Sequence, residues 1–402
     1  MKVRKKITFI LFLLSITLLL TGCWSKRELN ELAIGVALGI DRVDDQYEVT
    51  VQIVDPSELS IKQSSSRTSI VTYTTKGKTI FEAIRKMTLI SSRAIYLSHL
   101  QIMVIGEGVA NDGIKPTLEL LARDHEVRNN FYIVVSSKST AREVLNILTP
   151  LEKIPANKLF SSLEVSQKKW GVTSKMRLDQ LINHLSNDIK SAALTTVEII
   201  GDQKIGNDQT NMEIVNTPAL LQYSGLSIFK EDKLVGILNE EESKSYNYLR
   251  DEIESTIESV SCPKNDGNIA TQVINSKTEI KVKSIKDIPE FDVNINIEQN
   301  IGEVECQIDL TDSKTIKQFN EKESKQIEKR IKSLIEKLQN KYQVDVVGFG
   351  EKIYRSHPKE WKKIKGQWEE AIFPKAKINV KVNIKTKGLG TLRNSQLYEQ
   401  KE

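Results

Sequence analysis

Three segments in the second half of the chain alternate apolar and polar residues, and this pattern constrains the fold more than any other. Apolar residues occupy every second position of 291–297, 304–310 and 378–384, and Asp, Asn, Glu, Gln and Lys fill the positions between them. Successive side chains of a strand point to opposite faces, so each segment has one apolar and one polar face. The pattern predicts an antiparallel-rich sheet with one dry face.

One segment is long enough to cover that dry face. Residues 311–342 predict a charged helix whose apolar residues recur three and four positions apart: Ile316, Phe319, Ile327, Ile331, Leu334, Ile335 and Leu338. A coiled coil is the alternative, but the apolar series is interrupted across 320–326. The sequence therefore favours a long helix packed on the sheet.

The preceding part of the chain alternates strand-like and helix-like patterns. Apolar runs predict strands at 33–41, 100–105 and 131–135, and apolar residues at every second position predict a strand at 47–55. Helical patterns follow Thr79, a candidate N-cap, and cover 115–123, 141–148, 157–170 and 176–185. Strands that alternate with helices are typical of an α/β domain.

The expected fold class is thus multidomain α+β or α/β. We expect an N-terminal mixed α/β domain over 23–200 and a C-terminal α/β domain over 225–390. Turn-forming residues at 201–216 indicate a linker, placed at 201–224, and a polar tail covers 391–402.

The first 22 residues predict a secretory signal. Four cationic residues precede a short apolar run, which ends in Leu20-Thr21-Gly22-Cys23. This ending looks like the lipobox of bacterial lipoproteins, which predicts cleavage between Gly22 and Cys23 and S-diacylglycerol and N-acyl groups on Cys23. Stable membrane anchoring requires two signals, and the two acyl chains of the diacylglyceryl group on Cys23 would supply them. A signal anchor with an incidental cysteine is the alternative.

Charge argues against nucleic acid as a partner. Four of the 58 Lys and Arg residues lie before Cys23, so residues 23–402 carry 54 basic and 53 acidic groups, a net charge of +1. Nucleic-acid binding needs a basic surplus that displaces phosphate counterions.

The sequence predicts no enzyme, no cofactor and no metal site. Gly77-Lys78-Thr79 lacks the first glycine of a phosphate-binding loop, and the four histidines, His99, His125, His184 and His357, are scattered. Asp124 and Glu126 could form a catalytic carboxylate pair, but the neighbouring Arg123 and Arg128 favour a solvated ion-pair cluster.

Two cysteines of the mature chain remain after Cys23. Outside the cytoplasm Cys262 and Cys306 could form a disulfide. Two separately buried thiols are the alternative, and this alternative is the favoured one.

Several segments resemble the C subunits of spore nutrient germinant receptors, the Ger(x)C family. The matching segments, in chain order, are Cys23–Asp41, Ser92–Leu100 with Ile105–Glu107, Leu121–Arg128, Gly225–Gly236, and Gly348–Gly350 with Pro358–Trp361, Trp368 and Phe373-Pro374. Each segment alone is weak, but together and in this order they cover nearly the whole mature chain.

The resemblance implies a lipoprotein on the outer face of the cytoplasmic membrane, which is the inner membrane of the spore. It implies membrane-embedded A and B subunits as partners and a role in nutrient-triggered germination. Family members have three α/β domains, so the region 23–200 is expected to divide near 148–156. Candidate subunit contacts are Arg93, Tyr96, His99, Arg123, Asp124, Glu126 and Arg128.

Two other classes remain as alternatives. A solute-binding lipoprotein of an ABC importer would have two similar α/β lobes, but the two halves share no repeated pattern. A surface hydrolase would need nucleophile or metal motifs that the sequence lacks.

Overall fold

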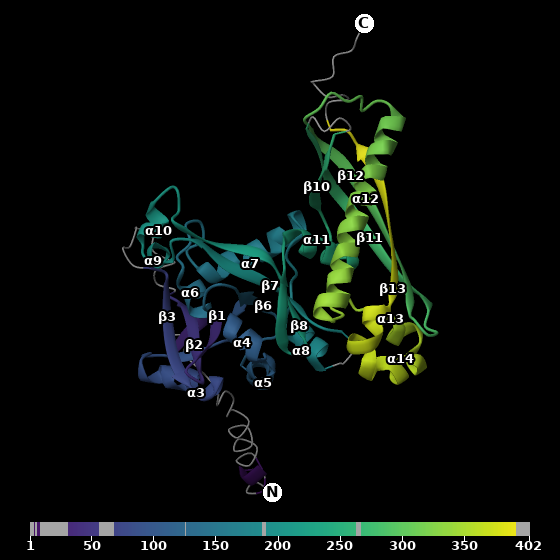
Figure 1. The fold of residues 1–402 in the computed structure, drawn as a ribbon. Coiled ribbons are helices and arrows are strands. Elements are labelled where there is room, and N and C mark those ends of the chain that lie inside the picture. Colours follow the sequence, from purple (N-terminus) through teal and green to yellow (C-terminus); the bar gives the residue numbers. More distant parts are fainter. Residues whose placement is uncertain are drawn as a thin grey trace.

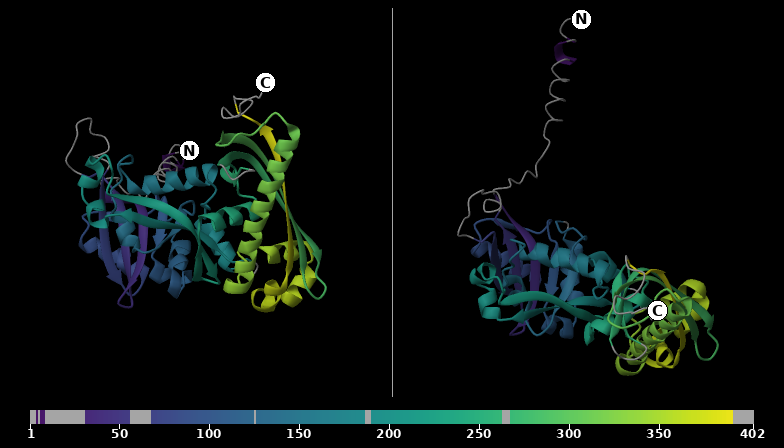
Figure 2. Two further views of the ribbon diagram at one scale, coloured as in Figure 1. Left: turned by 45° about the horizontal axis from the view of Figure 1, so that its top comes forward. Right: turned by 90° about the horizontal axis from the view of Figure 1, so that it is seen from above.

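The computed structural model describes residues 31–55, 68–124, 126–186, 190–262 and 267–390, together with residues 4 and 6–8. Two sheets lie side by side, each covered by helices (Figures 1 and 2). The expected class, a mixed α/β region followed by a second sheet with a long helix, is confirmed.

The larger sheet has nine strands in the order β3-β2-β1-β5-β6-β7-β8-β9, with β4 paired to the start of β1. Strands β1, β5, β6 and β7 are parallel neighbours at its centre, while β2, β3, β8 and β9 pair antiparallel. The strands are β1 (Leu32–Val43), β2 (Gln46–Val54), β3 (Ile70–Gly77), β4 (Ala94–Tyr96), β5 (Ile102–Ile105), β6 (Tyr132–Ser136), β7 (Ala193–Gly201), β8 (Ala219–Lys230) and β9 (Lys233–Leu238).

Helices cover both faces of this sheet, as expected for buried parallel strands. One face packs against α3 (Ile80–Lys86), the 3₁₀ turn η2 (Met87–Leu89), α4 (Glu107–Asp112), α5 (Lys115–Arg123) and α8 (Leu178–Ser186). The other face packs against α6 (Ala141–Asn146) and α7 (Pro155–Lys169). Thr79 caps α3 as predicted, because its hydroxyl accepts a hydrogen bond from the Glu82 amide at 3.1 Å.

The second sheet has the order β10-β11-β12-β13. Its strands are β10 (Thr256–Ser261), β11 (Asn268–Ser284), β12 (Glu290–Val304) and β13 (Lys377–Gly388), of which β12 and β13 run parallel. The long helix α12 (Ser313–Lys337), continued by one wider turn η3 (Leu338–Tyr342), lies across the dry face (Figure 1). Phe319, Ile327, Ile331, Leu334, Ile335 and Leu338 are buried there as predicted.

One sequence prediction of a strand is wrong. Residues 304–310 alternate in polarity, but β12 ends at Val304 and the segment beyond it joins no sheet. Cys306, Ile308 and Leu310 are buried because they pack beneath the start of α12 with Phe319. Alternating burial therefore arises here without strand pairing.

The large sheet continues across the expected linker at 201–224. That segment contains α9 (Gln203–Gly206), α10 (Thr210–Glu213) and the beginning of β8, which pairs with β7. Strands β8 and β9 then lead through α11 (Glu240–Leu249) to the second sheet. Residues 148–156, the expected point of division, connect α6 to α7, and Leu148 and Ala156 are buried in one core cluster.

A single apolar core joins the two parts of the molecule. It contains Ala193, Leu226, Ile228 and Leu238 from the large sheet, and it continues into α11, α12 and the dry face of β11 to β13. The two sheets therefore share buried surface instead of meeting at a loose contact.

Candidate functional site

The two predicted contact motifs meet at the end of the large sheet where its parallel strands begin. Residues 93–99 include β4, which pairs with the first residues of β1 (Leu32 opposite Ala94), and residues 123–128 follow α5 and precede β6. The Ser98 hydroxyl donates a hydrogen bond to the Glu126 carbonyl and so links the motifs. We call residues 93–99 and 123–128 the amino edge, because both motifs lie where the parallel strands begin.

Cationic and aromatic side chains cover this edge. Arg93, His99, Arg123 and Arg128 are exposed, and the Tyr96 and His99 rings lie 6.0 Å apart. Arg123 forms an ion pair with Glu119, one turn earlier on α5. Exposed groups of this kind suit contacts with another molecule, and an exposed ion pair adds little to stability.

One member of the candidate catalytic pair, Asp124, hydrogen-bonds to the backbone of this turn. A carboxylate oxygen of Asp124 accepts a hydrogen bond from the Glu126 amide at 2.9 Å, and the Asp124 carbonyl accepts one from the Val127 amide at 3.2 Å. Arg123 pairs with Glu119 and not with Asp124. The carboxylate of Asp124 therefore shapes the turn that positions the exposed arginines.

Cys262 and Cys306 form a disulfide in the structure, with Cα atoms 6.4 Å apart. The favoured alternative of two separate thiols does not hold there. The bridge ties the end of β10 to the segment after β12, within the cluster that also buries Val260 and Phe319. Cys23 and Gly22 lie outside the described residues.

The C-terminal segments that carry the family resemblance surround one buried carboxylate. Asp345 accepts hydrogen bonds from the amides of Gly348, Phe349 and Gly350 at 2.7–3.0 Å and from the Trp368 indole at 2.9 Å. Burial raises the pKa of Asp345, although these four donors oppose the shift. Donors of this number hold the start of α13 (Phe349–Ser356) in place.

Aromatic rings pack around this carboxylate. The Phe349 ring lies 5.1 Å from Phe291, and the Trp361 and Trp368 rings lie 5.6 Å apart, from α14 (Pro358–Ile364) and η5 (Trp368–Ile372). A Cβ atom at Gly350 would come within 2.6 Å of the Trp361 ring, so this position requires glycine. The resemblance in this region therefore reflects packing.

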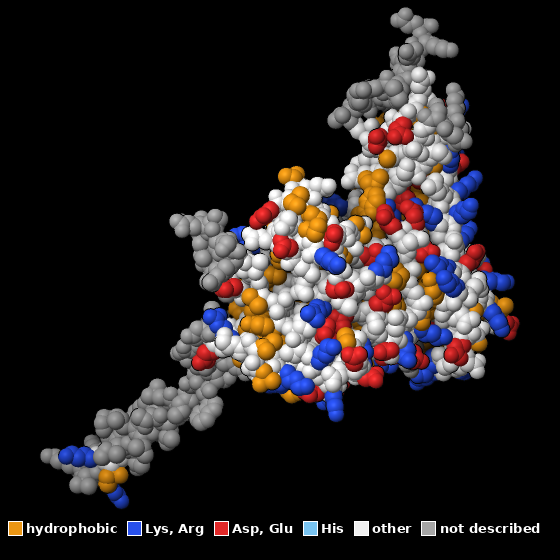
Figure 3. All heavy atoms as spheres, turned by 60° about the vertical axis from the view of Figure 1, so that its left-hand side comes forward, with side chains coloured by type: hydrophobic (Ala, Val, Ile, Leu, Met, Phe, Trp, Pro, Cys, Tyr) orange, Lys and Arg blue, Asp and Glu red, His pale blue; other side chains and the backbone are white. Residues whose placement is uncertain are grey.

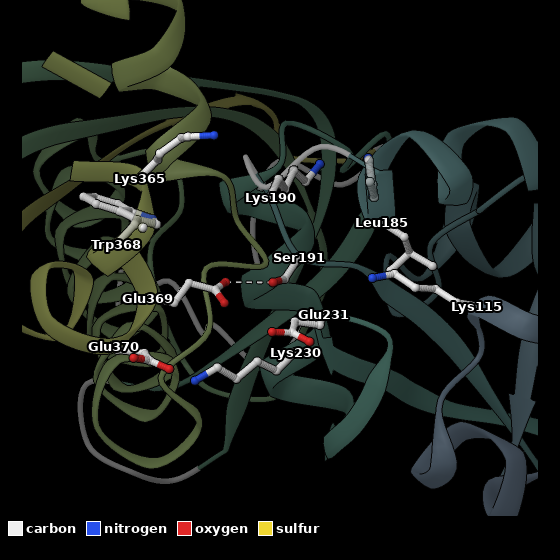
Figure 4. Close-up of a pocket in the computed structure, with 12 residues that line it drawn as sticks. Lys115, Leu185, Lys190, Ser191, Lys230, Glu231, Lys365, Trp368, Glu369 and Glu370 are labelled. Atoms are coloured by element: carbon white, nitrogen blue, oxygen red, sulfur yellow. Dashed lines mark hydrogen bonds between the residues drawn. The ribbon is translucent and has the colours of Figure 1, made fainter. Parts of the chain in front are cut away.

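A polar cavity of about 430 Å³ lies between the two parts of the molecule (Figure 4). Lys115, Lys190, Lys230 and Glu231 line it from the large sheet and its helices, and Lys365, Glu369 and Glu370 line it from the C-terminal part. Figure 4 shows the contact that crosses the cavity, a hydrogen bond of 2.7 Å from the Ser191 hydroxyl to Glu369. Glu369 also accepts a hydrogen bond from the Asp345 amide, so this pair connects the two parts.

Two groups at the cavity wall, Lys190 and His184, have lowered pKa values. Burial lowers the pKa of Lys190 to about 8, and the neighbouring Arg250 charge acts in the same direction. Burial, Lys190 and Arg250 together lower the pKa of His184 to about 4, which leaves the imidazole neutral at pH 7. This cavity could not be expected from the sequence, because its residues lie far apart along the chain and share no motif.

Within the described part of the chain, no cluster of three or more His, Cys, Asp or Glu residues could hold a metal ion. No helix among these residues is long and apolar enough to cross a bilayer.

Two family models match the chain. Residues 25–199 match the spore germination protein N-terminal domain, and residues 224–390 match the family described as spore germination B3/GerAC like, C-terminal.

Individual spore germination proteins are also similar to this chain over nearly its whole length. Spore germination protein KC of Bacillus subtilis (strain 168) is 32% identical over 99% of both chains. Spore germination protein B3 of the same organism is 26% identical over 98% of this chain and 100% of its own. The crystal structure of the GerBC protein superimposes with a TM-score of 0.57 at 21% identity, over 87% of this chain and 96% of that chain, and supports the fold.

Proposed function

The chain belongs to the spore germination B3/GerAC-like family, and from this premise we propose that it is the lipid-anchored C subunit of a nutrient germinant receptor. In this role it acts beside membrane-embedded A and B subunits on the outer face of the cytoplasmic membrane. The observation that carries the proposal is the match to Spore germination protein KC over 99% of both chains.

Anchoring through Cys23 is supported by the lipobox and by where the first strand begins. Strand β1 starts at Leu32, nine residues after Cys23, so the lipid and the fold are joined by a short tether. A tether raises the effective concentration of the domains for partners in the same membrane. Modest contact surfaces are then sufficient for assembly.

A non-catalytic role is supported by the engagement of the carboxylate that the sequence offered for catalysis. Asp124 is hydrogen-bonded within its turn, and Ser191 and Glu369 are used to connect the two parts of the molecule. The two sheets differ in strand number and order, unlike the two similar lobes of a solute-binding lipoprotein.

Genetic deletion in a strain that lacks redundant receptors tests the proposed function. We expect sporulation to continue, germination with one class of nutrient to slow, and germination by non-nutrient agents to persist. Normal responses to every nutrient would contradict the proposal.

The anchor is tested by Cys23→Ala, with Ser25→Ala as the matched control beside the lipobox. Cys23→Ala should abolish palmitate labelling, leave unprocessed precursor and weaken the nutrient response, whereas Ser25→Ala should be labelled normally. Labelling and trimming of the Cys23→Ala chain would show the anchor to be wrong.

The amino edge is the proposed contact with the A and B subunits. Arg128→Glu should reduce the amount of both subunits that copurifies with the tagged chain, because it reverses an exposed charge at this edge. Lys325→Glu, an exposed cation on α12, serves as the control. Equal copurification with both variants would exclude Arg128 as a contact.

A further inference from the structure

An apolar strip runs along the outer surface of α3 and η2. Phe81, Leu89 and Ile90 are 49%, 82% and 54% exposed, while Ile80 and Met87 on the inner surface are buried in the core. This short segment is therefore apolar on both sides, and its outer side has no partner among the described residues. Exposed apolar residues that gather on one element mark an interaction surface.

Phe81 and Arg85 lie one turn apart on α3, Leu89 ends η2, and Ile90 follows it. Phe81, Arg85 and Leu89 follow one another at intervals of four residues, and the Arg85 guanidinium lies 5.1 Å from the centre of the Phe81 ring. Ile90 extends the strip by one residue. Figure 3 looks onto the side of the molecule that carries α3, where hydrophobic side chains gather among Lys and Arg.

The strip lies within a basic segment. Residues 76–93 contain five Lys and Arg residues and one acidic residue, a net charge of +4, whereas the whole mature chain has a net charge of +1. The acidic residue, Glu82, pairs with Lys86 at 2.8 Å. Among the described residues, no carboxylate lies within 4.0 Å of the cationic groups of Lys78 or Arg85. These cations remain available to an anionic surface.

The strip ends beside the tether. Ala94, four residues after Ile90, pairs with Leu32 at the start of β1. The nine residues from Cys23 to Leu32 reach at most about 32 Å when extended. A lipid on Cys23 and the strip can therefore contact the same bilayer.

We propose that α3 and η2 dock the domain on the interfacial region of an anionic bilayer. Phe81, Leu89 and Ile90 enter the boundary between headgroups and acyl chains, and Lys78 and Arg85 face the lipid phosphates. Apolar side chains beside clustered cations are what an interfacial segment requires. The proposal rests on the proposed anchor at Cys23 only for the orientation that the tether imposes; the chemistry of the strip is independent of it.

Vesicle binding tests the strip without the lipid anchor. The full mature chain carrying Cys23→Ser is sedimented with phosphatidylcholine vesicles that contain either 30% phosphatidylglycerol or none. We expect binding to the anionic vesicles that falls with added salt and little binding to neutral ones, because each Lys or Arg near an anionic surface contributes roughly a fivefold gain in affinity. Absence of binding to either vesicle would overturn the proposal.

Substitutions locate the surface. Leu89→Ser with Ile90→Ser should weaken anionic-vesicle binding at least tenfold, and Lys78→Glu with Arg85→Glu should do the same and remove the salt dependence. Leu151→Ser is the matched control, because Leu151 is 95% exposed and lies outside this face. Circular dichroism of each variant verifies folding. Equal binding by Leu89→Ser/Ile90→Ser and Leu151→Ser would place membrane contact elsewhere.

A protein partner gives a different result. If the strip variants lose copurification with the A and B subunits but bind vesicles normally, the strip is a protein contact and the docking proposal is wrong. If the deletion strain responds normally to every nutrient, the proposed function is wrong, but the vesicle result is unaffected. The two proposals can therefore be contradicted independently of each other.

Discussion

A single buried carboxylate links the long helix α12 to the second sheet. Glu323 of α12 accepts hydrogen bonds from the Thr271 hydroxyl at 2.7 Å and from the Gln299 amide at 2.5 Å, both on the dry face of the sheet. Burial raises the pKa of Glu323 to about 7. A charge at this position is therefore costly at high pH, and the cost should be visible in stability.

We predict a pH-dependent effect of Glu323→Gln. Because the folded pKa lies above the ordinary 4.5, the wild-type chain has its full stability from this group below pH 4.5 and loses about 3 kcal/mol as the pH rises to and beyond 7. The variant should lose less over this range. Denaturant unfolding at pH 5 and pH 8 measures the difference, with exposed Glu321→Gln as control. Equal pH dependence in all three proteins would contradict the assignment.

Asp345 should be among the most sensitive single positions. Asp345→Ala leaves three backbone amides and the Trp368 indole without their acceptor, at a cost of about 3 kcal/mol or more. Asp287→Asn, an exposed residue in a turn, should change stability little. Thermal unfolding compares the two, and similar melting temperatures would show that the buried carboxylate is dispensable.

At the scale of elements, strand pairing determined which sequence predictions succeeded. Alternation predicts strands at 291–297 and 378–384, and both segments lie within strands, β12 and β13. Residues 304–310 carry the same pattern but pack under α12 without a partner strand. Alternating polarity shows that one side of a segment is buried. Whether the segment pairs as a strand depends on whether another strand lies beside it.

The sequence predicts the residues of the amino edge, but it does not predict that the two segments lie next to each other. The segments 93–99 and 123–128 are joined by the Ser98–Glu126 hydrogen bond, which depends on the parallel order of β1, β5 and β6. The cavity lined by Lys190 and Glu369 could not be predicted, since 178 residues separate Ser191 from its partner. Contacts between distant segments require the topology.

The disulfide should contribute measurably to the second sheet. It joins residues 44 positions apart, and in the chain-entropy model a loop of this length corresponds to about 4 kcal/mol. Cys262→Ser with Cys306→Ser should therefore lower the midpoint of denaturant unfolding, and reduction of the wild-type chain should lower it similarly. Alkylation of both thiols without prior reduction would show that the bridge is absent.

At the scale of the whole molecule, the large sheet decides which fragments can fold. A chain that ends at residue 201 leaves β7 without its partner β8, and an open strand edge invites aggregation. A chain that ends at 251 keeps β8, β9 and α11. We predict more soluble protein from 24–251 than from 24–201, measured by size-exclusion chromatography; equal yields of monomer would contradict this.

The shared core also limits how this protein can respond to a partner. Leu226, Ile228 and Leu238 are buried against α11 and α12, so opening the angle between the two sheets would expose this apolar surface to water. A hinge motion at this position would therefore cost the free energy of exposing that apolar surface. We therefore expect a movement imposed at the amino edge to reach β11 and β12 as a rotation of both sheets together, with the shared core kept closed.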